Sequence, residues 1–219
     1  MQVVREIVVL LKKELLLEWR MKYAISGILL YVLSAVFIIY AAFAEVEATT
    51  WNALFWSIVL FASINAIVKS FVQENGSRQL YYYQIASPIA LLVAKIIYNS
   101  GLLFALNLLT WAALAFMAGS PVQNNGLFFL ALLLGSTGLS ITFTFISAIS
   151  AKADNNATLT AILGFPVAIP ILLTLVRLSA NALQNAGGMG IQRDINILVA
   201  IDLVLAGMAI LLYPSLWRD

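Results

Sequence analysis

Six apolar stretches, each about long enough to cross a lipid bilayer, dominate this sequence. A spanning helix needs about 20 mostly apolar residues, because each residue rises about 1.5 Å through a hydrocarbon core near 30 Å thick. The pattern predicts an all-α integral membrane protein with six transmembrane helices, of which the last is the weakest because it carries Asp202. The stretches are residues 23–44, 51–72, 89–118, 127–150, 158–180 and 195–213.

The connections between these stretches are all short. Only 10% of the 219 residues are charged, whereas a soluble domain has about 25%. None of the connections can hold a soluble domain, so residues 1–219 are predicted to form a single transmembrane domain. The third stretch has 30 residues, more than one upright span needs. Its first turn and a half is expected in the interface, with Lys95 reaching toward the lipid headgroups.

Residues 1–22 combine charged and apolar side chains at helical spacing. An apolar stripe runs along this segment through Val3, Val4, Ile7, Leu10 and Leu11. Four charged residues lie roughly opposite, namely Arg5, Glu6, Lys12 and Lys13. The pattern predicts an amphipathic helix in the membrane interface. Glu14, Glu18 and Lys22 continue the stripe at i, i+4, so the helix either rests on lipid headgroups or docks against a partner subunit.

The basic residues predict which side the chain ends face. Six spans place both termini on one side, and cytoplasmic termini would put ten of the 12 Lys and Arg residues inside. Only Arg177 and Arg193 would lie outside, and Arg177 is expected to extend from the end of its span toward the surface. The positive-inside rule therefore predicts that both termini are cytoplasmic.

Several kinds of chemistry lack the residues that they need. The chain has no GxxxxGK[ST] phosphate loop and is not expected to bind ATP in the usual way. It has no His and no Cys, which excludes catalysis by those residues, a Cys-liganded zinc site and an axial His or Cys ligand for haem. No basic cluster stands clear of the membrane flanks, so no nucleic-acid partner is expected. The chain is predicted to be non-catalytic, with no metal and no directly bound cofactor.

The longest connection on the predicted cytoplasmic side runs from residue 73 to residue 88. Glu74 and Arg78 are spaced i, i+4, which favours a short helix, and a proline such as Pro88 is typical of the start of the next helix. A stiff segment of this kind suits the transmission of force from a soluble motor. The alternative is an interfacial belt, because the tyrosines at 81–83 would lie naturally at headgroup level. The candidates for contact with a motor are Glu74, Gly76, Arg78, Tyr82 and Pro88.

The fourth stretch is rich in small and polar residues, among them Gly135 and Gly138. Small residues let helices approach closely. This face is therefore expected to pack against another helix, which a second copy of the chain could supply. Asn65 and Asn107 are expected to form interhelical hydrogen bonds.

Two prolines, Pro166 and Pro170, lie at i, i+4 in the fifth stretch. Each removes a backbone donor and clashes with the preceding turn. The pair predicts a kinked helix whose freed carbonyls need partners in the bundle. The kink is either static or a hinge, and the presence of both prolines slightly favours a hinge.

Few acidic residues lie within the predicted spans, and Asp202, in the sixth stretch, is the exception. An ionised group there costs about 2.5–3.5 kcal/mol on insertion scales, so such a side chain usually faces protein or water. Asp202 either accepts hydrogen bonds between helices or belongs to a transport or coupling path.

Three of these regions, the 73–88 connection and the fourth and fifth stretches, also resemble a known family. The first parts of that family's pattern are a basic N-terminal helix and the loop at 71–88, which is followed by Val93-Ala94-Lys95. The next is Leu133-Leu134-Gly135, and then Ser147-Ala148-Ile149 leads into Ala151-Lys152-Ala153 and Asn155-Asn156. The last is Pro166 with Ile169-Pro170-Ile171. In their order and spacing the chain resembles the cytochrome c maturation permease family, CcmB, long called the haem exporter membrane subunit. The resemblance covers nearly the whole chain, most specifically residues 71–98 and 131–173.

The resemblance implies an ABC exporter (ABC-2-like) half-permease in the bacterial inner membrane, served by a separate cytoplasmic ATPase of the CcmA type. It also implies CcmC- and CcmD-type membrane subunits, a CcmE-type periplasmic haem chaperone and a second copy of the chain. The ATPase would bind the ATP and partner subunits would handle haem, in haem delivery or in release of the loaded chaperone. Two alternatives stay open: a permease that exports lipid or polysaccharide, and an ATP-independent membrane transporter or scaffold.

Overall fold

Long apolar segments become helices in a membrane because a helix satisfies its backbone N–H and C=O groups within the segment itself. The computed structural model describes residues 2–20, 22–43, 45–72, 87–150, 156–184 and 190–218. All regular secondary structure in those ranges is α-helical. The helices are α1 (Gln2–Arg20), α2 (Lys22–Ala42), α3 (Ala48–Val72), α5 (Pro88–Ala118), α6 (Asn125–Ser150), α7 (Asn156–Gln184) and α8 (Gly190–Arg218).

Five of these helices, α3 and α5 to α8, are long and apolar enough to cross a membrane. The last span, predicted to be the weakest because of Asp202, is one of the five, and α8 contains the most apolar 18-residue stretch among them. The described apolar part of α2 is shorter, Ser26–Ala42. The predicted all-α membrane fold is confirmed. That residues 1–219 act as one permease domain stays a prediction.

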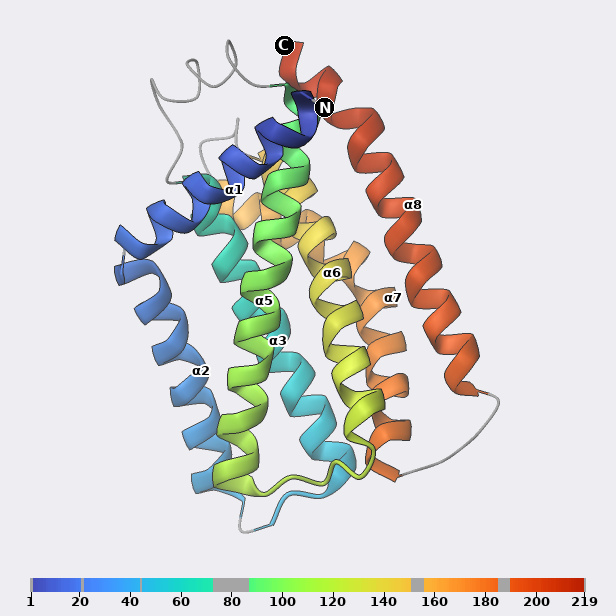
Figure 1. The fold of residues 1–219 in the computed structure, drawn as a ribbon. Helices are drawn as coiled ribbons and strands as arrows, with labels where there is room; N and C mark the ends of the chain where they lie inside the picture. Colours follow the sequence, from blue (N-terminus) through green and yellow to red (C-terminus); the bar gives the residue numbers. More distant parts are fainter. Residues whose placement is uncertain are drawn as a thin grey trace.

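The spanning helices lie side by side, with α6 at the centre of the bundle (Figure 1). It packs against α3, α5, α7 and α8. In contrast, α8 lies at the edge, and α1 crosses one end of the bundle and packs on α5. The start of α1 and the end of α8 lie at that same end (Figure 1), as an even number of spans requires.

An aromatic cluster joins three helices at the end opposite α1. Ring centroids of Trp51 and Phe55 on α3 lie 5.4 Å apart in a stacked arrangement, and Phe128 of α6 lies 5.5 Å from Phe55. The indole N–H of Trp51 donates to the carbonyl of Gly119, 3.1 Å away, directly after α5. Gly119 has a φ of +79°, a conformation that favours glycine. These contacts hold the starts of α3 and α6 to the end of α5.

Candidate functional site

The start of α5 is the described part of the predicted coupling segment. Pro88 is the first residue of the helix, as predicted, and Ser87 caps it by accepting a hydrogen bond from the backbone N–H of Ala90 at 3.3 Å. The other predicted contact candidates, Glu74, Gly76, Arg78 and Tyr82, lie outside the described residues.

Glu6 of α1 forms hydrogen bonds with this capped start of α5. The Glu6 carboxylate accepts hydrogen bonds from the Ser87 hydroxyl at 3.0 Å and from the Ser87 backbone N–H at 3.3 Å. A negative charge is also favourable beside the positive end of the helix dipole. Helix α1 therefore positions the residue that directly follows residues 73–86.

Two turns further along α5, a buried ion pair links the same two helices. Lys95 Nζ lies 3.6 Å from Glu14 Oε1, and Lys13 Nζ lies 3.1 Å from the same oxygen. The Lys95 side chain is only 2% exposed. The expectation that Lys95 reaches toward the headgroups is therefore wrong, because α1 lies over this part of α5 and supplies a carboxylate instead.

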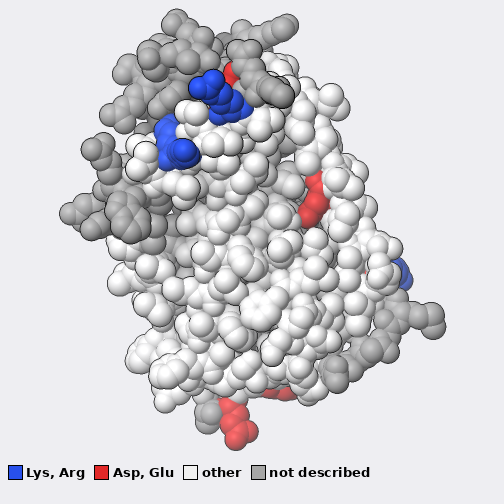
Figure 2. Space-filling view, viewed as in Figure 1, with Lys and Arg blue, Asp and Glu red and all other residues white. Residues whose placement is uncertain are grey.

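The apolar stripe predicted on α1 is divided between its two faces. Leu10 is buried with Ala90 and Leu91 of α5, whereas Val3 and Val4 are exposed. Lys12, like Val4, lies on the outward side of the helix. Figure 2 shows Lys and Arg side chains gathered at this end of the molecule above a flank that is almost free of charge. The inward face of α1 thus docks within the chain itself.

The glycines of α6 allow three helices to approach it closely. A Cβ atom at Gly135 would lie 2.9 Å from the Trp56 ring of α3 and 3.0 Å from Leu175 of α7. A Cβ at Gly138 would overlap the carboxyl group of Asp202 on α8. The predicted small-residue packing is therefore present within one chain, and this face of α6 does not need a second copy to cover it.

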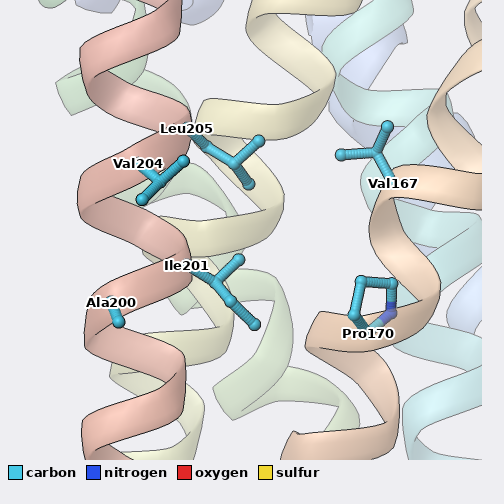
Figure 3. Close-up of a pocket in the computed structure, with 6 residues that line it drawn as sticks. All are labelled: Val167, Pro170, Ala200, Ile201, Val204 and Leu205. Carbon is cyan, nitrogen blue, oxygen red and sulfur yellow. The ribbon is translucent and has the colours of Figure 1, made fainter.

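The two prolines lie within a continuous helix, α7. Pro170 and Val167 line one side of an apolar groove of about 310 Å³ between α7 and α8. Figure 3 shows the groove with its four α8 residues, Ala200, Ile201, Val204 and Leu205, opposite them. The Pro170 carbonyl accepts a hydrogen bond from the Thr174 hydroxyl at 2.8 Å. A hinge at these prolines stays a prediction.

Asp202 lies where α8 meets α6. Its residue is 9% exposed, and its Oδ2 atom lies 3.2 Å from the Thr137 hydroxyl of α6. Its Oδ1 atom is buried and has no hydrogen-bond partner among the residues that the structure describes. The carboxyl group is therefore only half satisfied, which distinguishes it from an ordinary interhelical acceptor.

The sequence was compared with models of known protein families. The sequence model described as CcmB protein matches residues 5–214, which include the α1–α5 contact, the 73–88 segment and Asp202. The chain belongs to the CcmB family. Proteins of this family are membrane subunits of the ABC-type system for haem export and cytochrome c maturation. No curated protein matches the chain significantly.

One buried polar network of this CcmB-family chain was missed by the sequence reasoning. Asn52 of α3 donates to the Val176 carbonyl of α7 at 2.8 Å and accepts from the Ser179 hydroxyl at 2.7 Å. The Trp56 indole donates to Ser179 at 2.8 Å. Polar residues at helical spacing in α3, Asn52 and Trp56, were a signal that this face meets a polar partner.

The predicted amide contacts have different outcomes. Asn107 of α5 donates to the Ser136 hydroxyl of α6 at 2.9 Å, so its interhelical bond is confirmed. Asn65 instead donates to the Phe61 carbonyl of its own helix and is exposed, so that prediction is wrong. Asn99, which was not singled out, donates across to Thr144 of α6 at 2.9 Å. The composition of a span does not reveal which way each amide faces.

Proposed function

We propose that this chain is the permease subunit of a cytochrome c maturation complex in the bacterial inner membrane, with both termini cytoplasmic. In this proposal residues 73–88 bind a CcmA-type ATPase. ATP hydrolysis by that partner drives haem delivery or release of a haem-loaded CcmE-type chaperone. CcmC- and CcmD-type subunits and a second copy of the chain complete the complex.

The observation that carries this proposal is the double contact between α1 and the start of α5. Glu6 holds the residue that follows the proposed ATPase-binding segment, and the Glu14–Lys95 ion pair holds α5 two turns further along. A pull or push on residues 73–86 would reach both helices at once, because neither can shift at this end without breaking the Glu6–Ser87 hydrogen bonds or the buried Glu14–Lys95 ion pair. A stiff connection of this kind is what a membrane subunit needs in order to respond to a soluble motor.

The first test reverses one charge in the proposed contact. Arg78→Glu should reduce association with the ATPase and lower the yield of mature c-type cytochromes, because it places a negative charge in the contact. Arg193→Glu, at the start of α8 and therefore at the opposite end of the bundle, is the matched control and should have little effect. Wild-type activity in the Arg78→Glu variant, at equal amounts of protein, would rule out this role for the segment.

A second test asks which complex the chain enters. The tagged chain is purified from its native membrane in mild detergent, and the co-purifying proteins are identified by mass spectrometry. An ATPase of the cytochrome maturation type, together with haem-handling membrane subunits, supports the proposal. An ATPase with lipid- or sugar-export neighbours would favour the exporter alternative, and the absence of any ATPase would favour the ATP-independent one.

A further inference from the structure

The carboxyl group of Asp202 lies on the single stripe of α8 that faces the bundle. The buried residues of α8 recur on one side of the helix, at Asp194, Leu198, Asp202, Ala209 and Tyr213. The other side is apolar and exposed, and Leu203 and Leu211 are 68% and 79% exposed. Between residues 195 and 213, where α8 carries no other charged residue, the helix therefore turns one acidic side chain toward its neighbour α6.

The surroundings of this carboxyl group contain too few donors for a carboxylate. Oδ1 is buried against Gly138 and receives no hydrogen bond from the described part of the chain. In that part, Oδ2 has one hydrogen-bonding neighbour, the Thr137 hydroxyl oxygen at 3.2 Å. An ionised carboxylate can only accept hydrogen bonds, so this single hydroxyl would be its whole supply.

The proton of Thr137 already has a better acceptor. Its hydroxyl oxygen lies 2.9 Å from the Leu134 carbonyl and 3.2 Å from the Leu133 carbonyl, both in the preceding turn of α6. A threonine hydroxyl has one proton, and in a helix it commonly donates to such a carbonyl. The same hydroxyl can also donate to Asp202 Oδ2 at 3.2 Å, but it can donate its one proton to only one of these acceptors at a time. When the proton goes to Leu134, the contact with Oδ2 needs a donor from the Asp202 side. A protonated carboxyl group supplies it.

No cation within the described residues compensates a charge on Asp202. The helices packed against α8 are α5, α6 and α7. Among their described residues, α6 has no charged side chain, α7 has only Arg177, which is exposed, and α5 has Lys95, which pairs with Glu14, and the titratable Tyr98. Asp202 itself forms no ion pair within the described part of the chain.

We propose that the Asp202 carboxyl group is a proton-binding site within the membrane. The carboxyl group keeps its proton while α8 lies against α6, and loss of the proton causes the two helices to separate. The proton is the ligand, the Thr137 oxygen accepts it in a hydrogen bond, and Gly138 leaves the space that the carboxyl group occupies. Deprotonation would place a negative charge against a Cα atom and a single hydroxyl group, which together stabilise it less than water would. The released charge would be solvated only if α8 moved away from α6.

The protonation state can be measured on the wild-type chain. In infrared spectra of the full chain in lipid nanodiscs at neutral pH, we expect the C=O band of a protonated carboxyl group. The band should be absent in Asp202→Asn and present in Asp194→Asn, the matched control on the same helix. A wild-type spectrum without a protonated-carboxyl band would overturn the proposal, whether or not the variants fold.

The helix movement can be measured separately, because the natural chain has no Cys. Spin labels at Leu133→Cys on α6 and Leu211→Cys on α8, both exposed positions, report the distance between the two helices. This distance should increase as the pH rises through the loss of the infrared band, and it should not change in the same labelled chain with Asp202→Asn. An equal increase in the Asn variant, or no increase in the wild type after the band is lost, would refute the switch.

Discussion

Replacing Glu14 with leucine should destabilise this chain far more than an ordinary surface change. The substitution removes the carboxylate 3.6 Å from Lys95, whose side chain is 2% exposed. Removal of one partner from a buried ion pair costs about 3–5 kcal/mol. The separation in this pair is longer than a hydrogen bond, so we expect the lower limit, about 3 kcal/mol. Lys95→Met should cost less, because Lys13 stays 3.1 Å from the remaining carboxylate.

The double variant Glu14→Leu with Lys95→Met separates charge from packing. It removes both charges and fills the same space with apolar atoms, a change that is often neutral or stabilising for buried pairs. The double variant should therefore recover most of the stability that Glu14→Leu loses. Lys12→Met, on the exposed side of the same helix, is the control and should change stability by less than about 0.5 kcal/mol.

Thermal unfolding of the purified chain in detergent measures these effects. One kcal/mol shifts the Tm of a protein of 150–250 residues by about 2–4 °C, so Glu14→Leu should lower Tm by about 6–12 °C. If the double variant is as unstable as Glu14→Leu alone, then the loss comes from packing and not from removal of the Glu14 charge beside Lys95. A loss below about 1 kcal/mol in Glu14→Leu would show that the pair behaves like an exposed one.

Other contacts predict smaller and equally specific effects. Gly135→Ala should destabilise the chain by about 1–3 kcal/mol, because the added methyl group would lie 2.9 Å from the Trp56 ring. A thermal unfolding experiment that shows no loss would mean that α3 and α6 are not tightly packed there. Asn107→Ala should destabilise the chain by about 0.6–1.7 kcal/mol, because its hydrogen bond to Ser136 is lost, whereas Asn65→Ala should be nearly neutral. The reverse order of stabilities in unfolding experiments would contradict the orientations of the two side chains. Trp56→Phe should destabilise the chain by about 1 kcal/mol, because the ring stays but the indole N–H that donates to α7 is lost; an unchanged Tm would show that this bond contributes nothing.

The hydrophobic pattern predicts where the helices of this protein lie, because a backbone in lipid must bond to itself. Each of the six apolar stretches lies almost wholly within one described helix, and Pro88 begins α5 as a proline at that position should. The family could also be identified from the order of short motifs, since these lie along the chain and need no tertiary information.

The partners of individual side chains could not be predicted in this way. Lys95 was expected to reach the headgroups, but α1 folds over it and provides Glu14. Asn65 and Asn107 are chemically identical, yet one bonds to its own helix and the other to α6. What the sequence alone determined is the set of helices and the family, because both follow from local hydrophobicity and motif order. Only the tertiary structure decided which polar groups meet, because their pairing depends on the rotation of each helix about its own axis. In lipid this rotation is set by close packing and interhelical hydrogen bonds, and not by the burial of apolar side chains from water.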